Sequence, residues 1–148
     1  MLSVLEAEGE GIASVLATLC GITVAGGEKT RRARNLRADV IILSRSGVSL
    51  LSDGGKKAVC RILVLPGSAV ASFSGPEKKI TYGMAASDDV TFSSVSDSKC
   101  ILAVQRELTV LSGAVVERQE FPVVKPEGVS PENLMAAYAG LLAGGIIV

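Results

Sequence analysis

The stretch ADVIILS, residues 38–44, decides the fold class of this chain. A continuous apolar run of this length is typical of a strand that is buried on both faces of a parallel sheet. The stretch CRILVLPG, residues 60–67, has the same character and ends in a Pro-Gly turn. The two runs therefore predict two buried strands of a parallel sheet, with two glycine turns and a short helix between them at 46–57.

Further elements are expected on both sides of these strands. Residues 22–27 fit either a strand end or a turn. The upstream pattern predicts a strand at 3–8, a helix at 11–20 and a basic helix of about two turns at 28–36. The downstream pattern predicts a short helix at 68–73, a strand at 78–83, an alternating strand at 88–95, and a hairpin of 99–108 with 112–123.

The chain ends in a strongly marked helix. Ser130 is typical of an N-cap, Pro131 of the first helical position and Glu132 of a first turn, while Gly144 and Gly145 favour a stop. The whole pattern predicts a three-layer α/β fold, with helices on both faces of a mostly parallel sheet, a C-terminal antiparallel hairpin and a final helix. Without a visible repeat or linker, we expect one domain over residues 1–148.

The composition limits the classes of function. Fifteen basic residues balance 15 acidic ones, so net charge gives no general attraction to nucleic acid or to an anionic membrane. Histidine is absent, which excludes His-based triads, His metal sites and the usual general acid or base near neutral pH. The acidic N-terminal segment is unlike a signal peptide, and the apolar stretch 134–148 is too short to span a bilayer. We therefore expect a cytoplasmic protein that binds neither nucleic acid nor membrane.

The stretch GGEKT, residues 26–30, raises the question of a phosphate-binding loop. A Walker-type loop needs Gly-x-x-x-x-Gly-Lys-Ser/Thr, but Lys29 comes two residues too late after Gly21 and Gly26. We interpret the stretch as a turn that starts a solvated basic helix to which Arg34 and Arg37 also belong. Anion binding is the alternative, and its candidate residues are Gly26, Gly27, Lys29, Thr30, Arg31 and Arg32.

Two acids stand at the end of the first predicted strand. Glu6 and Glu8 alternate along the chain, so their carboxylates could converge on one hard cation such as magnesium. The alternative is that both are exposed acids at a strand end.

No nucleophile with a partner is apparent in the sequence. Ser44 and Ser46 have no base to activate them. Cys20, Cys60 and Cys100 fit no metal spacing, so we interpret these cysteines as reduced core thiols. The sequence therefore identifies no catalytic residue.

The segment KKITYGMAASDDVTFSSV, residues 78–95, resembles the central domain of the Mur ligases and folylpolyglutamate synthases. Segments before and after it resemble the family in the same order, including SVLEAEGEGIA at 3–13, ADVIILS at 38–44 and SPENLMAAYAGLLAGGI at 130–146. The resemblance implies an ATP-dependent amide-bond ligase fold in which the strand bearing Glu6 helps to hold magnesium.

The departures from that family pattern are extensive. In the family, a Gly-Thr-Asn-Gly-Lys-Thr loop precedes the strand that residues 3–8 resemble, and we expect this phosphate loop to be missing here. The family's Asp-His pair is replaced around Arg45, and its Asn-Asp-Asp-Pro turn is replaced by LPGS at 65–68. Of the family's functional positions, only Glu6 and Asn133 match. We therefore expect a chain that is not a ligase and has no cofactor, with ATP and magnesium as the alternative.

Three functional hypotheses follow from the sequence. The first is a non-catalytic interaction or assembly module that forms a homo-oligomer, because a sheet without its phosphate-loop strand leaves an edge to cover. The second is a binding protein for a small anion, such as a nucleotide or a cell-wall precursor. The third is a subunit of an ATP-dependent ligase complex in which a protein partner supplies the phosphate loop.

Overall fold

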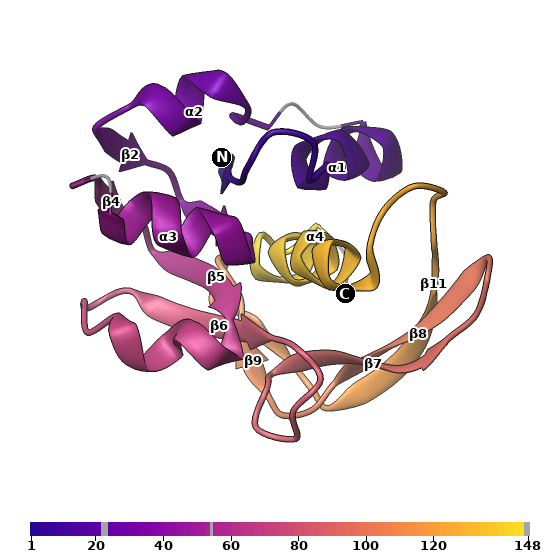
Figure 1. The fold of residues 1–148 in the computed structure, drawn as a ribbon. Coiled ribbons are helices and arrows are strands. Elements are labelled where there is room, and N and C mark those ends of the chain that lie inside the picture. The colour runs from indigo at the N-terminus through magenta and orange to yellow at the C-terminus, as the bar shows by residue number, and fades with distance from the viewer. Residues whose placement is uncertain (22–23, 54, 147–148) are drawn as a thin grey trace.

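A computed structural model describes residues 1–21, 24–53 and 55–146, and these form a mixed α/β fold (Figure 1). Seven strands make the main sheet, in the order β1-β3-β5-β6-β7-β8-β11. Their bounds are β1 (Leu2–Leu5), β3 (Val40–Leu43), β5 (Ile62–Pro66), β6 (Lys78–Tyr82), β7 (Val90–Val95), β8 (Lys99–Val104) and β11 (Gln119–Val124).

The remaining elements are short strands and helices. Two small sheets pair β2 (Asn35–Arg37) with β4 (Lys57–Val59), and β9 (Leu108–Thr109) with β10 (Val115–Val116). The helices are α1 (Ile12–Cys20), α2 (Glu28–Arg32), α3 (Arg45–Asp53), α4 (Pro131–Ala143) and the 3₁₀ helix η1 (Gly67–Ser72). Among the described residues, no helix is both long enough and apolar enough to cross a membrane.

The buried strands form the parallel part of the sheet, as predicted. β3 pairs in parallel with β1 on one side and with β5 on the other, and every residue of these three strands is buried. β6 and β7 continue the parallel order. The sequences of β3 and β5 are continuously apolar because both faces of these two strands are covered.

The antiparallel part of the sheet is larger than the predicted hairpin. β8 pairs with β11 as expected, and it also pairs antiparallel with β7, with an irregularity between Phe92 and Ser94. The chain between β8 and β11 carries the small β9–β10 ladder. On α4, the Tyr138 hydroxyl donates to the Val124 carbonyl at 2.7 Å, which ties β11 to that helix.

Two hydrophobic clusters occupy opposite faces of the parallel strands, because successive side chains of a strand alternate in direction. Val4 and Ile42 belong to the cluster that includes α1 and α4, whereas Leu5 and Ile41 belong to the one that includes Leu51 of α3. In Figure 1, α4 lies inside the curve formed by β7, β8 and β11. The final helix begins as predicted, since the Ser130 hydroxyl accepts from the Asn133 N–H at 3.1 Å.

Three predicted elements differ from the structure. The basic helix predicted at 28–36 is only five residues long, because Ala33 is extended and residues 35–37 form β2, which buries Leu36. The strand predicted at 3–8 ends at Leu5, where the chain turns toward α1. The helix predicted between two glycine turns starts at Arg45 and contains Gly47. Of the stretch 22–27, residues 22 and 23 lie outside the described residues.

Candidate functional site

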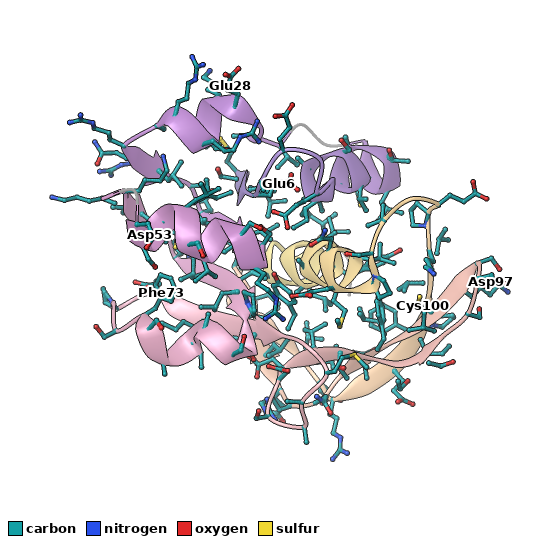
Figure 2. All side chains as sticks on the ribbon, viewed as in Figure 1. Glu6, Glu28, Asp53, Phe73, Asp97 and Cys100 are labelled. Carbon is teal, nitrogen blue, oxygen red and sulfur yellow. The ribbon has the colours of Figure 1, made fainter. Side chains whose placement is uncertain are left out.

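Glu6 leaves the carboxyl end of β1 and caps the start of α1. Its side chain is only 5% exposed, and its carboxylate accepts from the Ile12 N–H at 2.7 Å and the Ala13 N–H at 3.0 Å. A carboxylate at this position satisfies free backbone donors and interacts favourably with the positive end of the helix dipole. Figure 2 shows Glu6 in the interior, beside the beginning of α1. Both of its oxygens are therefore used within the fold.

The other acids of this loop have separate positions. Glu8 is exposed, whereas the Glu10 carboxylate accepts from the Ala7 N–H and from the Ser44 hydroxyl, both at 2.6 Å. The Asn133 amide donates to the Glu10 carbonyl at 3.1 Å, so this residue joins α4 to the loop. Within the described ranges, no group of three or more Cys, Asp and Glu side chains could hold a metal ion. The pair Glu6 and Glu8 thus offers a cation at most one carboxylate that is free of backbone partners.

The glycine turn at 26–27 starts α2. Gly27 has a φ of 72°, in the left-handed region that favours glycine. The Thr30 hydroxyl lies within donating distance of two carbonyl oxygens, those of Val4 and Gly27, each at 2.9 Å. Thr30 is buried and so fastens α2 to β1. Gly26 packs closely against Ala13, since a Cβ on Gly26 would lie 3.0 Å from the Ala13 Cβ. The turn is used for packing and does not border the cleft described next.

A cleft of about 780 Å³ borders α2 and α3, which flank β2 and β4 in Figure 1. Four cationic and two acidic side chains line this cleft. The cations are Arg31, Arg32, Arg34 and Lys56, and the acids are Glu8 and Asp53. Of the six anion-binding candidates from the sequence, the structure brings only Arg31 and Arg32 to this site, which we call the basic cleft.

Two of these cations also hold the backbone around the basic cleft. The Nη1 of Arg31 lies 3.4 Å from the carbonyl oxygen of Glu6, which places this guanidinium at the carboxyl end of β1. The Lys56 ammonium donates to the carbonyl oxygens of Arg31 and Ala33, at the end of α2. These contacts fix the two side chains without neutralising them, because a carbonyl carries no net charge.

The other two cations are solvent-exposed. Arg32 forms a 2.7 Å ion pair with Glu28, one turn earlier on α2, and both side chains are mostly exposed. Exposed ion pairs of this kind contribute little to stability, so the Arg32 guanidinium can leave Glu28 for an anionic ligand at low cost. Arg34 is exposed and takes part in no ion pair within the described part of the chain. Its guanidinium is thus the cation that is most available to a ligand.

One face of α3 forms the opposite wall of the basic cleft. Ser46, Ser49, Leu50 and Asp53 line it, at the spacing i, i+3, i+4 and i+7 that places side chains on one helix face. Sequence reasoning missed this wall and also Lys56. The spacing of the two serines and Asp53 is visible in the sequence, but only the fold shows that this face turns toward Arg31 and Arg34.

A second cavity, of about 680 Å³, lies at the carboxyl ends of β5 and β6. Arg45 lines it but is paired with Glu132 at 2.9 Å. Burial raises the pKa of Tyr82 well above its ordinary value, so its hydroxyl stays protonated and donates to the Leu43 carbonyl at 2.7 Å. Asp88 is buried here. The described lining of this cavity holds one cation, Arg45, beside the carboxylates of Asp88 and Glu132, so this cavity is less suited to an anion.

The cysteines have the packing role that the sequence suggested for them. All three are free thiols, Cys100 being buried and the other two half-buried. Burial, with a smaller contribution from the Glu77 carboxylate, raises the pKa of Cys60 to about 11. Cys60 is therefore protonated at neutral pH, and a protonated thiol is a poor nucleophile.

Comparison with protein-family models, with curated proteins and with solved structures found no match to this chain. The resemblance to the Mur ligases thus stays a prediction from residues 78–95 and the segments around them. The arrangement of the basic cleft is consequently the main guide to function.

Proposed function

We propose that this chain binds a small anionic ligand in the basic cleft. The observation that carries the proposal is the collection of four cationic side chains in one cleft that holds only two carboxylates. The whole chain has equal numbers of basic and acidic residues, so this excess is a local property. A concave surface with an excess of one charge sign concentrates counter-ions of the opposite sign.

The position of the basic cleft supports the proposal. Arg31 lies at the carboxyl end of β1, and Ser46 lies in the first turn of α3, which follows β3. In open α/β sheets, ligands bind outside the carboxyl ends of the parallel strands. Arginine also suits this role because its planar guanidinium can donate two parallel hydrogen bonds to a phosphate or a carboxylate.

The chemistry of the basic cleft supports binding rather than catalysis. The only hydroxyl groups that line it belong, within the described ranges, to Ser46 and Ser49, and the chain has no histidine to activate them. No Cys side chain lines the cleft among the described residues. We therefore assign the cleft a recognition role, without a covalent step.

A charge reversal at Arg34 tests the proposal. We expect wild-type protein to bind inorganic phosphate or pyrophosphate at low ionic strength, and Arg34→Glu to weaken that binding at least tenfold. The reason is the loss of a charged donor and the addition of a carboxylate that repels the ligand. Isothermal titration calorimetry measures the change directly, and raising the salt concentration should weaken binding because the site is open to solvent.

Arg37→Glu is the matched control for this experiment. Arg37 is also exposed and belongs to the same basic segment, but it does not line the cleft. Both variants change the net charge of the protein equally. Because only Arg34 lines the cleft, only Arg34→Glu should weaken the binding of phosphate. Equal weakening by both variants, or no binding of phosphate and pyrophosphate at millimolar concentration to the wild type, contradicts the proposal.

A second candidate function is assembly through the antiparallel strands. The edge of β1, where the sequence predicted an open strand, is covered by Ala25, whose carbonyl accepts from the Val4 N–H at 2.8 Å. Strand β11, in contrast, pairs only with β8 among the described strands. Its outward residues include Pro122 and Val124, and Val124 is 62% exposed. An edge strand presents backbone donors and acceptors with which another chain can pair, and the exposed side chain of Val124 adds apolar surface beside them. Pro122 supplies no N–H and Gln119 and Glu120 are also exposed, so Val124 carries the apolar part of the contact.

We expect the chain to form a homodimer through β11, and Val124→Glu to convert it to a monomer. Burying the introduced carboxylate at the contact would be unfavourable. Light scattering coupled to size exclusion at micromolar concentration measures the mass, and Val115→Glu is the control, since Val115 is similarly exposed but lies on β10. A monomeric wild type contradicts this candidate function and leaves the basic cleft unaffected.

The finer architecture is also a proposal of ours. We infer a three-layer, Rossmann-like arrangement, supported by the two hydrophobic clusters on opposite faces of the parallel strands. Descent from a Mur-ligase central domain is compatible with it and would explain a ligand site at the strand ends. The proposed binding function does not depend on that descent.

A further inference from the structure

We infer that the ligand of the basic cleft is a phosphorylated sugar or polyol rather than a nucleotide. This inference rests on the proposed anion-binding function and specifies the rest of the ligand. Three properties of the cleft lead to it: its net charge, the polar groups along α3 and the absence of an aromatic surface among its described lining residues.

The charge of the basic cleft matches one phosphate monoester. Four cationic and two acidic side chains leave an excess of two positive charges. A phosphate monoester carries about −1.5 to −2 charges near neutral pH. A triphosphate would bring more negative charge than this excess compensates, and the carboxylates of Glu8 and Asp53 would repel it.

The α3 wall offers groups that recognise hydroxyls. Ser46, Ser49 and Asp53 follow one face of the helix over seven residues, which corresponds to about 10 Å. A serine hydroxyl both donates and accepts hydrogen bonds, and an ionised carboxylate accepts them from an alcohol. Glu8 contributes a second carboxylate from the loop after β1. A polyol can satisfy these groups along its length, while the arginines hold its phosphate.

A nucleobase, by comparison, finds no aromatic side chain to stack on among the described lining residues of the basic cleft. The apolar residues that line the cleft are Ala7 and Leu50. Proteins that bind bases commonly stack them on aromatic side chains or on arginine. Here Arg31 is engaged with the Glu6 carbonyl and Arg32 with Glu28, and the exposed Arg34 is the cation that the phosphate itself requires. A base would also make no use of the serines and carboxylates, so it would gain none of the hydrogen bonds that a polyol can form along α3.

The test measures dissociation constants by isothermal titration calorimetry for inorganic phosphate, glucose, AMP, glucose 6-phosphate, glucosamine 6-phosphate and glycerol 3-phosphate. We expect at least one sugar or polyol phosphate to bind ten or more times tighter than inorganic phosphate. AMP should bind less tightly than the best sugar or polyol phosphate, because its ribose offers only the 2′ and 3′ hydroxyl groups and its base finds no stacking partner. Glucose alone should show no measurable binding, since it lacks the anion.

Removing a carboxylate distinguishes recognition of the sugar hydroxyls from recognition of the phosphate. Asp53→Ala should weaken the best sugar phosphate at least fivefold, yet leave inorganic phosphate unchanged or bound slightly tighter. Asp97→Ala is the control, because Asp97 is exposed on the distant β7–β8 turn, where Figure 2 labels it. Both positions are exposed, so neither change should unfold the protein.

The outcomes distinguish the inference from the proposed function. If inorganic phosphate binds but no sugar or polyol phosphate binds tenfold tighter, or if AMP binds tightest, the ligand class is wrong and the anion site stands. If Asp53→Ala weakens inorganic phosphate and sugar phosphate equally, the carboxylate does not recognise the sugar. If none of the phosphates binds, the proposed function itself fails.

Discussion

Gly47→Ala is expected to lower the free energy of unfolding by about 3 kcal/mol, among the largest effects of a single methyl group in this protein. Gly47 is buried in the first half of α3, where a Cβ would lie 2.0 Å from the carbonyl oxygen of Leu5 and 2.9 Å from its carbonyl carbon. Both are backbone atoms of β1, so no side-chain rotation can relieve the clash. The helix would have to move away from the sheet, exposing apolar surface around Leu51.

Urea unfolding followed by far-UV circular dichroism measures this change. Gly144→Ala is the control, because Gly144 is the C-cap of α4, has α-helical backbone angles, and its nearest neighbour would lie 3.4 Å from an added Cβ, an ordinary contact. That variant should be neutral or slightly stabilised, since alanine favours a helix more than glycine does. A Gly47→Ala protein as stable as the control would show that α3 does not pack so closely on the end of β1.

Glu6→Ala is expected to cost about 3 kcal/mol of stability, because two backbone N–H groups at the start of α1 lose their charged acceptor. The Ile12 N–H is buried, so water cannot easily replace the carboxylate. Removal of the negative charge also takes away its favourable interaction with the helix dipole. Thermal and urea unfolding measure the loss, and amide hydrogen exchange should show faster opening of the first turn of α1.

Two further variants define the origin of the effect. Glu6→Gln keeps one oxygen that can accept a hydrogen bond, so it should lose about half as much stability as Glu6→Ala. Its NH₂ group replaces the second oxygen and cannot accept a hydrogen bond from the other backbone N–H. Glu8→Ala should change stability by less than about 0.5 kcal/mol, because Glu8 is exposed. If Glu6→Ala and Glu8→Ala are equally harmless, Glu6 is not the cap of α1 and becomes available again as a ligand.

The fate of the two glutamates shows why site prediction from sequence was incomplete. Alternation along a strand would have placed Glu6 and Glu8 on the same face, but β1 ends at Leu5, so the alternation rule no longer applies to them. Glu6 instead turns inward to α1, and Glu8 reaches the basic cleft. A strand boundary that is wrong by a few residues thus changes which side chains can meet.

The basic segment shows the same limit for a helix. Its polar, charged sequence favours a helix of about two turns, yet pairing of Leu36 with Ala58 between β2 and β4 ends the helix after Arg32. This parallel pairing joins residues that are 22 positions apart, and a local propensity contains no information about it. The early end of α2 is also what separates Arg34 from the helix and places it at the cleft.

The sequence by itself determined the elements with strong local signals. These are the buried strands around Ile41 and Val64, whose continuous apolar residues require burial on both faces, and the last helix, whose cap and stop residues are local. Only the tertiary structure decided the basic cleft, because Arg34, Ser46 and Lys56 come together through parallel crossovers between distant strands. The physical reason is that strand pairing and side-chain capping depend on long-range contacts, which a sequence pattern of neighbouring residues does not specify.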